Sequence, residues 1–141
     1  MLFRSWPYVQ DDGEFEQIIK EEEGFPYWEQ LDYSVHLMAE NPEDKVHEWV
    51  SAGVSQIIVH VEAIKNFDVL KKEIGEGTDL VLALKLETPL DAIKQYADSI
   101  SGIHLMTIKE IGYQGIEFEE GAIEKVKEAR KMYPEIGRAH V

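Results

Sequence analysis

Four apolar segments of strand length alternate with helical patterns along the chain, and this alternation constrains the fold more than any other feature. The segments are Tyr33–Met38, Gln56–Val61, Leu80–Leu86 and Ile103–Ile108. Two of them are rich in β-branched residues, which is typical of strands. His60 follows His36 by 24 positions and Lys85 follows His60 by 25. This is the spacing of repeated strand–helix units, so the sequence predicts an α/β fold with a parallel sheet.

The intervening segments carry helix signals. The first predicted helix begins with Asn41 as N-cap and Pro42 at its first position, and ends at Gly53. The second places Phe67, Leu70 and Ile74 on one face. Two more are expected over 88–99 and 119–133, and another at Gly13–Glu23. The third has a Thr88 cap before Pro89, and the fourth an apolar face of Ile123, Val126, Arg130 and Tyr133.

Composition excludes several functional classes. The 141 residues hold 14 Lys plus Arg against 28 Asp plus Glu, a net charge of −14. Such a chain is unsuited to non-specific nucleic-acid binding, which depends on cations that neutralise phosphates. There is no cysteine, and the apolar runs are too short to span a bilayer, so we expect a cytoplasmic protein that is not bound to a membrane.

Polar or soft side chains occur near the carboxyl end of every predicted strand, where a buried parallel strand would otherwise be apolar. Ligand sites of α/β folds lie at these ends. Residues two apart project to one side of a sheet, so each pair is expected to face the same way. We therefore predict a binding site there, built from His36 and Met38, His60 and Glu62, Lys85 and Glu87, and His104 and Met106.

The residues around these positions resemble a known family. "VHLMAENPEDKVHEWVSAGVSQIIVHVEA" resembles the third and fourth strand–helix units of ribulose-phosphate 3-epimerases, in which a V-H-L-M strand precedes an N-P-E helix start. The next strand of that family ends in H-x-E-A, matched by residues 60–63. "LALKLETPLDAI" and "HLMTIKEIGYQGIEFEEGAIEKV" resemble its later units more weakly. The resemblance extends from Leu31 to Glu135.

The resemblance implies a (β/α)₈ barrel, a TIM barrel, that epimerises a ketopentose phosphate at the carbon beside its carbonyl. It implies a divalent metal cation (Zn, Fe, Mn or Co) held by two His and two Asp, and a small phosphorylated sugar as substrate. His36 matches the family's strand-three metal ligand, and Met38 would line the same pocket. Gly112, Tyr113, Gln114 and Gly115 match a G-F-G-G lid that closes on the substrate. Homo-oligomerisation of the longer protein stays open.

The sequence also departs from the family pattern. The other metal ligands and both acid/base aspartates belong to strands two and seven, and neither motif is found here. "DDGEF" at 11–15 imitates one of them, but no His-x-Asp precedes it. Lys85-Leu86 replaces an N-P pair, and Lys109-Glu110, with Ile111 inserted, replaces N-P-G. These changes leave pentose-phosphate specificity open. A sugar-phosphate-binding barrel that is non-catalytic, or that reacts differently, is the alternative.

Lys85 allows a specific version of that alternative. At a strand end it could act as an electrophile or form a Schiff base. The simpler interpretation pairs it with a neighbouring carboxylate such as Glu62.

The two ends of the chain indicate a fragment. Residues 2–5 (LFRS) and 136–141 (IGRAHV) are what a common sequencing-library adaptor encodes on its two strands. We therefore expect residues 1–5 and 136–141 not to be authentic protein, and residues 1–141 to form one incomplete barrel domain with strands three to six of eight. Exposed sheet edges would make this fragment poorly soluble or oligomeric, and inactive.

Overall fold

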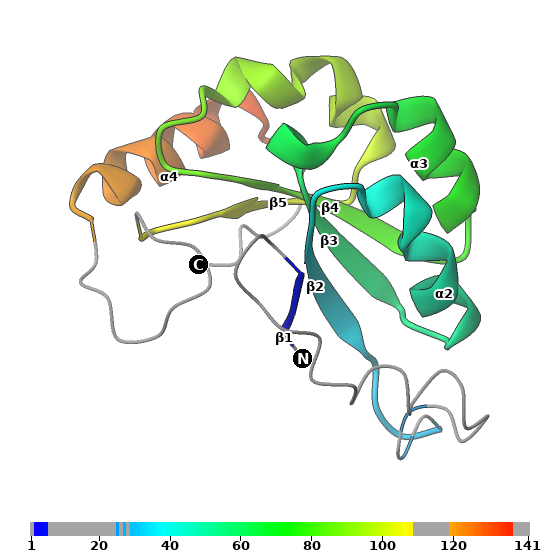
Figure 1. The fold of residues 1–141 in the computed structure, drawn as a ribbon. Helices are drawn as coiled ribbons and strands as arrows, with labels where there is room; N and C mark the ends of the chain where they lie inside the picture. Colours follow the sequence, from blue (N-terminus) through cyan, green and yellow to red (C-terminus); the bar gives the residue numbers. More distant parts are fainter. Residues whose placement is uncertain (1, 6–24, 26, 28, 109–118, 137–141) are drawn as a thin grey trace.

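The computed structural model describes residues 2–5, 25, 27, 29–108 and 119–136, with residues 2–5 as backbone only. It contains a parallel sheet of five strands in the order β1-β2-β3-β4-β5 (Figure 1). Every neighbouring pair is parallel. The strands are β1 (Leu2–Ser5), β2 (Ser34–Ala39), β3 (Gln56–His60), β4 (Asp79–Leu84) and β5 (Gly102–Leu105).

All helices in the described part of the chain lie on one face of this sheet (Figure 1). The α-helices are α2 (Val46–Ser51), α3 (Phe67–Ile74) and α4 (Gly121–Met132). The 3₁₀ helices are η1 (Pro42–Asp44), η2 (Val61–Ala63) and η3 (Leu90–Ser99). No helix in the described ranges is long and apolar enough to cross a membrane. The predicted helix at Gly13–Glu23 lies outside the described residues.

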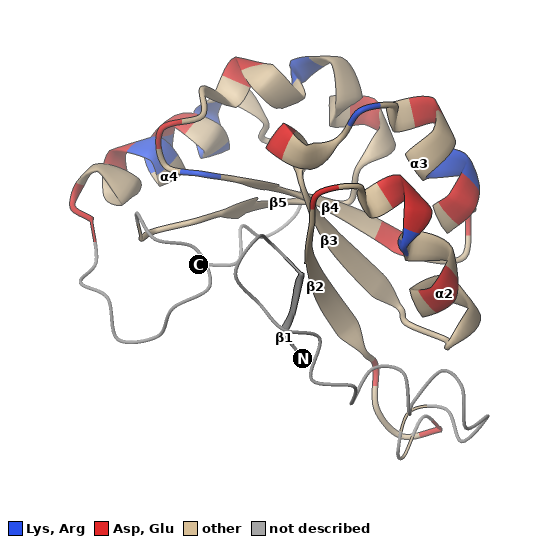
Figure 2. Ribbon diagram, viewed as in Figure 1, with Lys and Arg blue, Asp and Glu red and all other residues tan. Residues whose placement is uncertain are grey.

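The main core fills the space between the sheet and these helices. Alternate strand residues point into it, because successive side chains of a strand project to opposite faces. The strands contribute Val35, Leu37, Ile57, Val59, Leu80, Leu82, Leu84, Ile103 and Leu105, and the helices contribute Trp49, Leu70, Ile74, Ile93 and Ala129. The residues between them face away from the described helices. Three of these, Ile58, Val81 and Ala83, form a separate small cluster. Charged side chains are concentrated on the helices and connecting segments, and the strands carry few (Figure 2).

The four predicted strands are confirmed, and the sheet has one strand more. Leu2–Ser5 lies in parallel beside β2, with Leu2 opposite His36. An edge strand offers unpaired N–H and C=O groups to any extended segment. Because this pairing is made by the backbone, it does not depend on the side chains of residues 2–5.

The first predicted helix is interrupted, and its predicted cap is wrong. η1 and α2 are separate helices with Lys45 between them. Asn41 precedes η1 but caps it with no side-chain hydrogen bond, because its amide oxygen accepts instead from the ammonium of Lys65. The predicted end is confirmed: Gly53 has a φ of 92°, a conformation that favours glycine.

The third predicted helix is a 3₁₀ helix and begins at Leu90, after Pro89 rather than after a Thr88 cap. Its apolar residues explain this geometry. Leu90, Ile93 and Tyr96 are three positions apart, and a helix with three residues per turn brings such positions onto one line. Leu90 and Ile93 are buried, and the ring of Tyr96 stacks on that of Phe67 with centroids 4.2 Å apart.

The predicted apolar face of the fourth helix is half right, because Val126 and Tyr133 pack against the core but Ile123 and Arg130 do not. Ile123 is half exposed and Arg130 is exposed, whereas the buried residues of α4 are Ala122, Lys125 and Ala129. The two alanines allow the helix to approach its neighbours closely. With this side of α4 facing inward, the ammonium of Lys125 donates to backbone carbonyl groups. These hydrogen bonds make burial of its charge tolerable.

Candidate active site

Three histidines project from the face of the sheet that lies opposite the described helices, and we call this the histidine face. His36 is on β2, His60 on β3 and His104 on β5. The strand register brings them together, because His60 lies opposite Ala83 of β4, which in turn lies opposite His104. The small side chain of Ala83 leaves room between the two rings. The site is therefore built by strand pairing and not by loops.

His36 is at the centre of this cluster. Its Nε2 lies 2.9 Å from Nε2 of His60, a hydrogen-bond distance, and the two rings are nearly parallel, at 17°, with centroids 5.0 Å apart. The ring of His104 is also 5.0 Å from that of His36, but tilted by 57°. His36 and His60 are both buried.

Burial and the neighbouring imidazoles keep His36 neutral. Desolvation is the largest cause, and the proximity of His60 and His104 adds to it; together they lower the pKa of His36 to about 3. A neutral imidazole keeps a lone pair on one ring nitrogen, which is the form that binds a metal or accepts a hydrogen bond. His36 therefore retains this form throughout the physiological pH range.

Glu62, in η2 immediately after β3, connects the histidines to the next segment. Its Oε2 lies 3.4 Å from Nδ1 of His60, and its Oε1 accepts from the backbone N–H of Lys85 at 2.9 Å and from the hydroxyl of Thr88. Burial alone would raise the pKa of Glu62, but the interactions with His60, Thr88 and the backbone of Lys85 outweigh it and lower the pKa to about 2. Glu62 is therefore a carboxylate at neutral pH.

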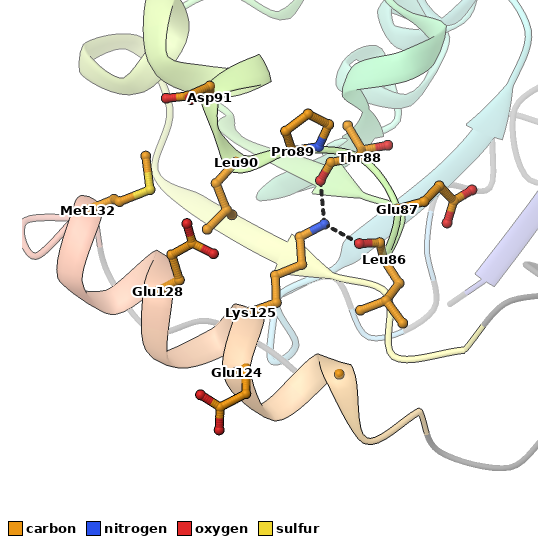
Figure 3. Close-up of a pocket in the computed structure, with 11 residues that line it drawn as sticks. Leu86, Glu87, Thr88, Pro89, Leu90, Asp91, Glu124, Lys125, Glu128 and Met132 are labelled. Atoms are coloured by element: carbon orange, nitrogen blue, oxygen red, sulfur yellow. Dashed lines mark hydrogen bonds between the residues drawn. The ribbon is translucent and has the colours of Figure 1, made fainter.

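A cavity of about 420 Å³ lies between α4 and the segment that follows β4 (Figure 3). Lys125 lies within its lining and donates to the carbonyl oxygens of Lys85 at 2.6 Å, Leu86 at 2.8 Å and Thr88. Burial lowers the pKa of Lys125, although nearby carboxylates act in the opposite direction. Four carboxylate side chains also line the cavity, Glu87, Asp91, Glu124 and Glu128. With its one cation occupied by carbonyl groups, this lining does not favour a phosphate.

Comparison with known proteins identifies the family to which the chain belongs. The profile of the ribulose-phosphate 3-epimerase family matches residues 19–140. The chain belongs to this family. It is 30% identical over 109 residues to the ribulose-phosphate 3-epimerase of Bacillus subtilis (strain 168), covering 77% of the chain and 50% of that protein. It is 33% identical over 103 residues to the enzyme of Candida glabrata, covering 72% of the chain and 42% of that protein.

The chloroplastic ribulose-5-phosphate-3-epimerase of Arabidopsis thaliana is 30% identical over 112 residues, which cover 76% of the chain and 39% of that protein. The chain spans about half the length, or less, of these curated relatives. The five-stranded parallel sheet with helices on one face is consistent with part of the α/β barrel expected for a ribulose-phosphate 3-epimerase family member.

The residues predicted as a site in this family member fall into three groups. His36 is on the histidine face, and the alternation of β2 places the buried Met38 on the same face. Gly112, Tyr113, Gln114 and Gly115 lie outside the described residues. The third group, Lys85 and Glu87, follows the end of β4 at Leu84. Strand alternation does not extend to them, so it does not set which side of the sheet they face, and that expectation stays a prediction.

The surroundings of Lys85 and Glu87 are known in part. Glu87 lines the cavity beside α4. Lys85 donates its backbone N–H to Glu62, so the contact seen between these two residues is a backbone hydrogen bond.

Sequence reasoning placed His60, Glu62 and His104 in the predicted binding site but gave none of them an individual role. It missed Lys125 altogether. A signal for Lys125 is present, since Ala122, Lys125 and Ala129 share one helical face, but the apolar residues Ile123 and Val126 indicate a different face more strongly.

The metal implied by the family finds one suitable ligand here, and no complete site. His36 is neutral and meets the donor requirements of a divalent metal. Within residues 25–108 and 119–136, however, no group of three or more His, Asp or Glu is arranged to hold an ion. The described residues therefore do not suffice to bind a metal.

Proposed function

We propose that the whole protein is an epimerase-type isomerase that acts on a ketopentose phosphate. The observation that carries the proposal is the position of His36, the residue that matches the family's strand-three metal ligand. It lies on the histidine face, among side chains from three strands. Membership of the ribulose-phosphate 3-epimerase family supports the same reaction class. We place the protein in the cytoplasm, in keeping with its lack of cysteine.

In this proposal His36 is one ligand of a divalent cation, with Zn, Fe, Mn and Co as the candidates. Such a cation, when bound, polarises the substrate carbonyl and its neighbouring hydroxyl group. The remaining ligands come from residues outside the described part of the chain. Met38 supplies an apolar wall beside His36, and Gly112–Gly115 supplies a lid over the sugar phosphate.

Proton removal and return need two carboxylates on opposite faces of the substrate. We assign neither role to a residue of this chain, and we expect both aspartates in the preceding and following strand–helix units of the whole protein. In this proposal the described residues help to bind the substrate and to orient it. Glu62, bound to Thr88 and to the backbone of Lys85, acts within the structure and not on the substrate.

The coding sequence on either side of these 141 residues tests this proposal first. An upstream His-x-Asp strand and a downstream Val-Asp-Gly strand are expected, followed by epimerase activity and one bound divalent metal in the expressed whole protein. If the whole protein lacks either aspartate but still binds a ketopentose phosphate, it is a binding protein and not an epimerase. Reductive trapping of a ketose phosphate on Lys85 by borohydride would identify a different reaction.

A further inference from the structure

We propose that the carboxylate of Glu62, acting through His60, fixes the tautomer of His36, so that the lone pair of His36 is on Nδ1. Glu62 and His60 are thus positioning residues for His36. The assignment of a tautomer stands on geometry alone; its use in binding a cation rests on the proposed function.

This effect is transmitted through two contacts between three residues. Oε2 of Glu62 lies 3.4 Å from Nδ1 of His60, and Nε2 of His60 lies 2.9 Å from Nε2 of His36. The second distance is that of a hydrogen bond, so one of these two nitrogens carries a proton and the other a lone pair. The first distance is that of a charge contact and not of a hydrogen bond. The His60 side chain is only 1% exposed, whereas that of the charged Glu62 is 20% exposed.

The carboxylate decides which nitrogen of His60 is protonated. An ionised carboxylate has only lone pairs, so a lone pair on Nδ1 of His60 would face an anion without a proton between them. Because the His60 ring is buried, water screens this repulsion only in part. His60 therefore carries its proton on Nδ1 and its lone pair on Nε2. His36 must then donate from its own Nε2, which leaves its lone pair on Nδ1.

The position of Glu62 is itself fixed from the opposite side. Its Oε1 accepts from the backbone N–H of Lys85, a group that can only donate, and from the hydroxyl of Thr88. The carboxylate can therefore not turn away from His60 without breaking two hydrogen bonds. In metal sites, a partner of this kind sets which ring nitrogen of a histidine binds the ion.

This arrangement predicts an unusual response to Glu62→Gln. The amide oxygen must stay with the N–H of Lys85, since the alternative places two donors against each other. The amide NH₂ then faces Nδ1 of His60 and donates to it. His60 is left with its proton on Nε2, which it donates to His36. Both tautomers of the pair are therefore reversed, although the side chain keeps its shape.

The test is nitrogen NMR of the 141-residue chain with ¹⁵N-labelled histidine side chains at pH 8, where imidazoles are neutral. Protonated and unprotonated ring nitrogens have well-separated shifts, and single substitutions assign the five histidines. Where the chain self-associates, the whole protein gives the same readout. We expect a proton on Nδ1 of His60 and on Nε2 of His36, and the reverse of both in Glu62→Gln. Glu87→Gln, which removes an exposed carboxylate after β4, should leave the wild-type pattern.

A proton on Nε2 of His60 in the wild type would overturn the proposal, and so would an unchanged pattern in Glu62→Gln. A second measurement separates this outcome from failure of the proposed function. In the whole protein, Glu62→Gln should weaken Mn²⁺ binding by about 10- to 100-fold, the effect typical of lost ligand orientation. The predicted tautomers without any metal binding would contradict the proposed function and leave the assignment of the tautomers intact.

Discussion

The ammonium nitrogen of Lys125 lies 2.8 Å from the carbonyl oxygen of Leu86. This contact joins α4 to the segment after β4, whose residues Lys85 and Thr88 also bind Glu62. The same segment thus receives Lys125 on one side and Glu62 on the other. A helix 40 positions along the chain from Lys85 therefore supports the residues that hold Glu62 beside His60.

Replacing Lys125 with Met should destabilise the protein. The substitution keeps most of the apolar stem but removes the ammonium donor from three backbone carbonyl groups, of which that of Lys85 also accepts from the N–H of Thr88. A buried acceptor left without a donor costs about 1–3 kcal/mol. These carbonyl groups are partly buried, so we expect the free energy of unfolding, measured by urea denaturation, to fall by about 2 kcal/mol in total. Lys127→Met is the control, because Lys127 forms an exposed pair with Glu124. Such pairs contribute about 0–1 kcal/mol. Equal effects of the two substitutions would contradict the role given to Lys125.

Gly102→Ala should also destabilise the sheet. A Cβ atom at this position would lie 3.2 Å from Cγ2 of Val81, and the β-branched Val81 has little freedom to move aside. Overpacking of this kind costs about 1–3 kcal/mol, and we expect the low end of that range. Gly77→Ala is the matched control, since an added Cβ there meets no atom within 4 Å. The double variant Gly102→Ala with Val81→Ala should regain part of the loss, and an additive loss would argue against the contact.

The stability of the chain should fall as pH decreases below 6.5, in part because of His36. The unfolded chain takes up a proton on this residue near pH 6.5, whereas the folded chain does so only near its lowered pKa of about 3. Stability from His36 is therefore fully present above pH 6.5 and is lost as pH falls toward 3, by at most about 1.4 kcal/mol per pH unit. His60, His104 and Glu62 are the titratable groups around it.

Urea midpoints at pH 7.5, 6.5 and 5.5 measure this dependence. His36→Gln should flatten the decline between pH 6.5 and 5.5, and His47→Gln should not, because the side chain of His47 is 70% exposed. A decline as steep in His36→Gln as in the wild type would show that other groups are responsible.

The sheet was predictable because its signals are local. Each strand is a short apolar run, and the 24- and 25-residue spacing between strand ends indicates parallel pairing. The face on which His36 lies follows from the same alternation. The histidine cluster was only partly predictable, since the distance from His36 to His60 depends on register, and the gap between His60 and His104 depends on the small Ala83.

The errors arose where tertiary contacts override local patterns. Asn41 is a good cap by composition, but its amide is bound to Lys65, 24 positions away. The helical spacing of Ile123, Val126 and Tyr133 misses the most buried side of α4, where three distant carbonyl groups bind Lys125. Neither partner can be inferred from the helix sequence alone.

The most direct test of the account is solvent exchange at the reacting carbon. The whole protein is incubated in deuterium oxide with a ketopentose phosphate, and deuterium at the carbon beside the carbonyl is followed by NMR. We predict deuterium incorporation by the wild type and by His47→Asn. In His36→Asn the rate should fall by about 100-fold or more, because loss of a metal ligand should cost at least as much as loss of an orienting partner. Incorporation at the wild-type rate in His36→Asn would contradict the central claim that this imidazole belongs to the active site.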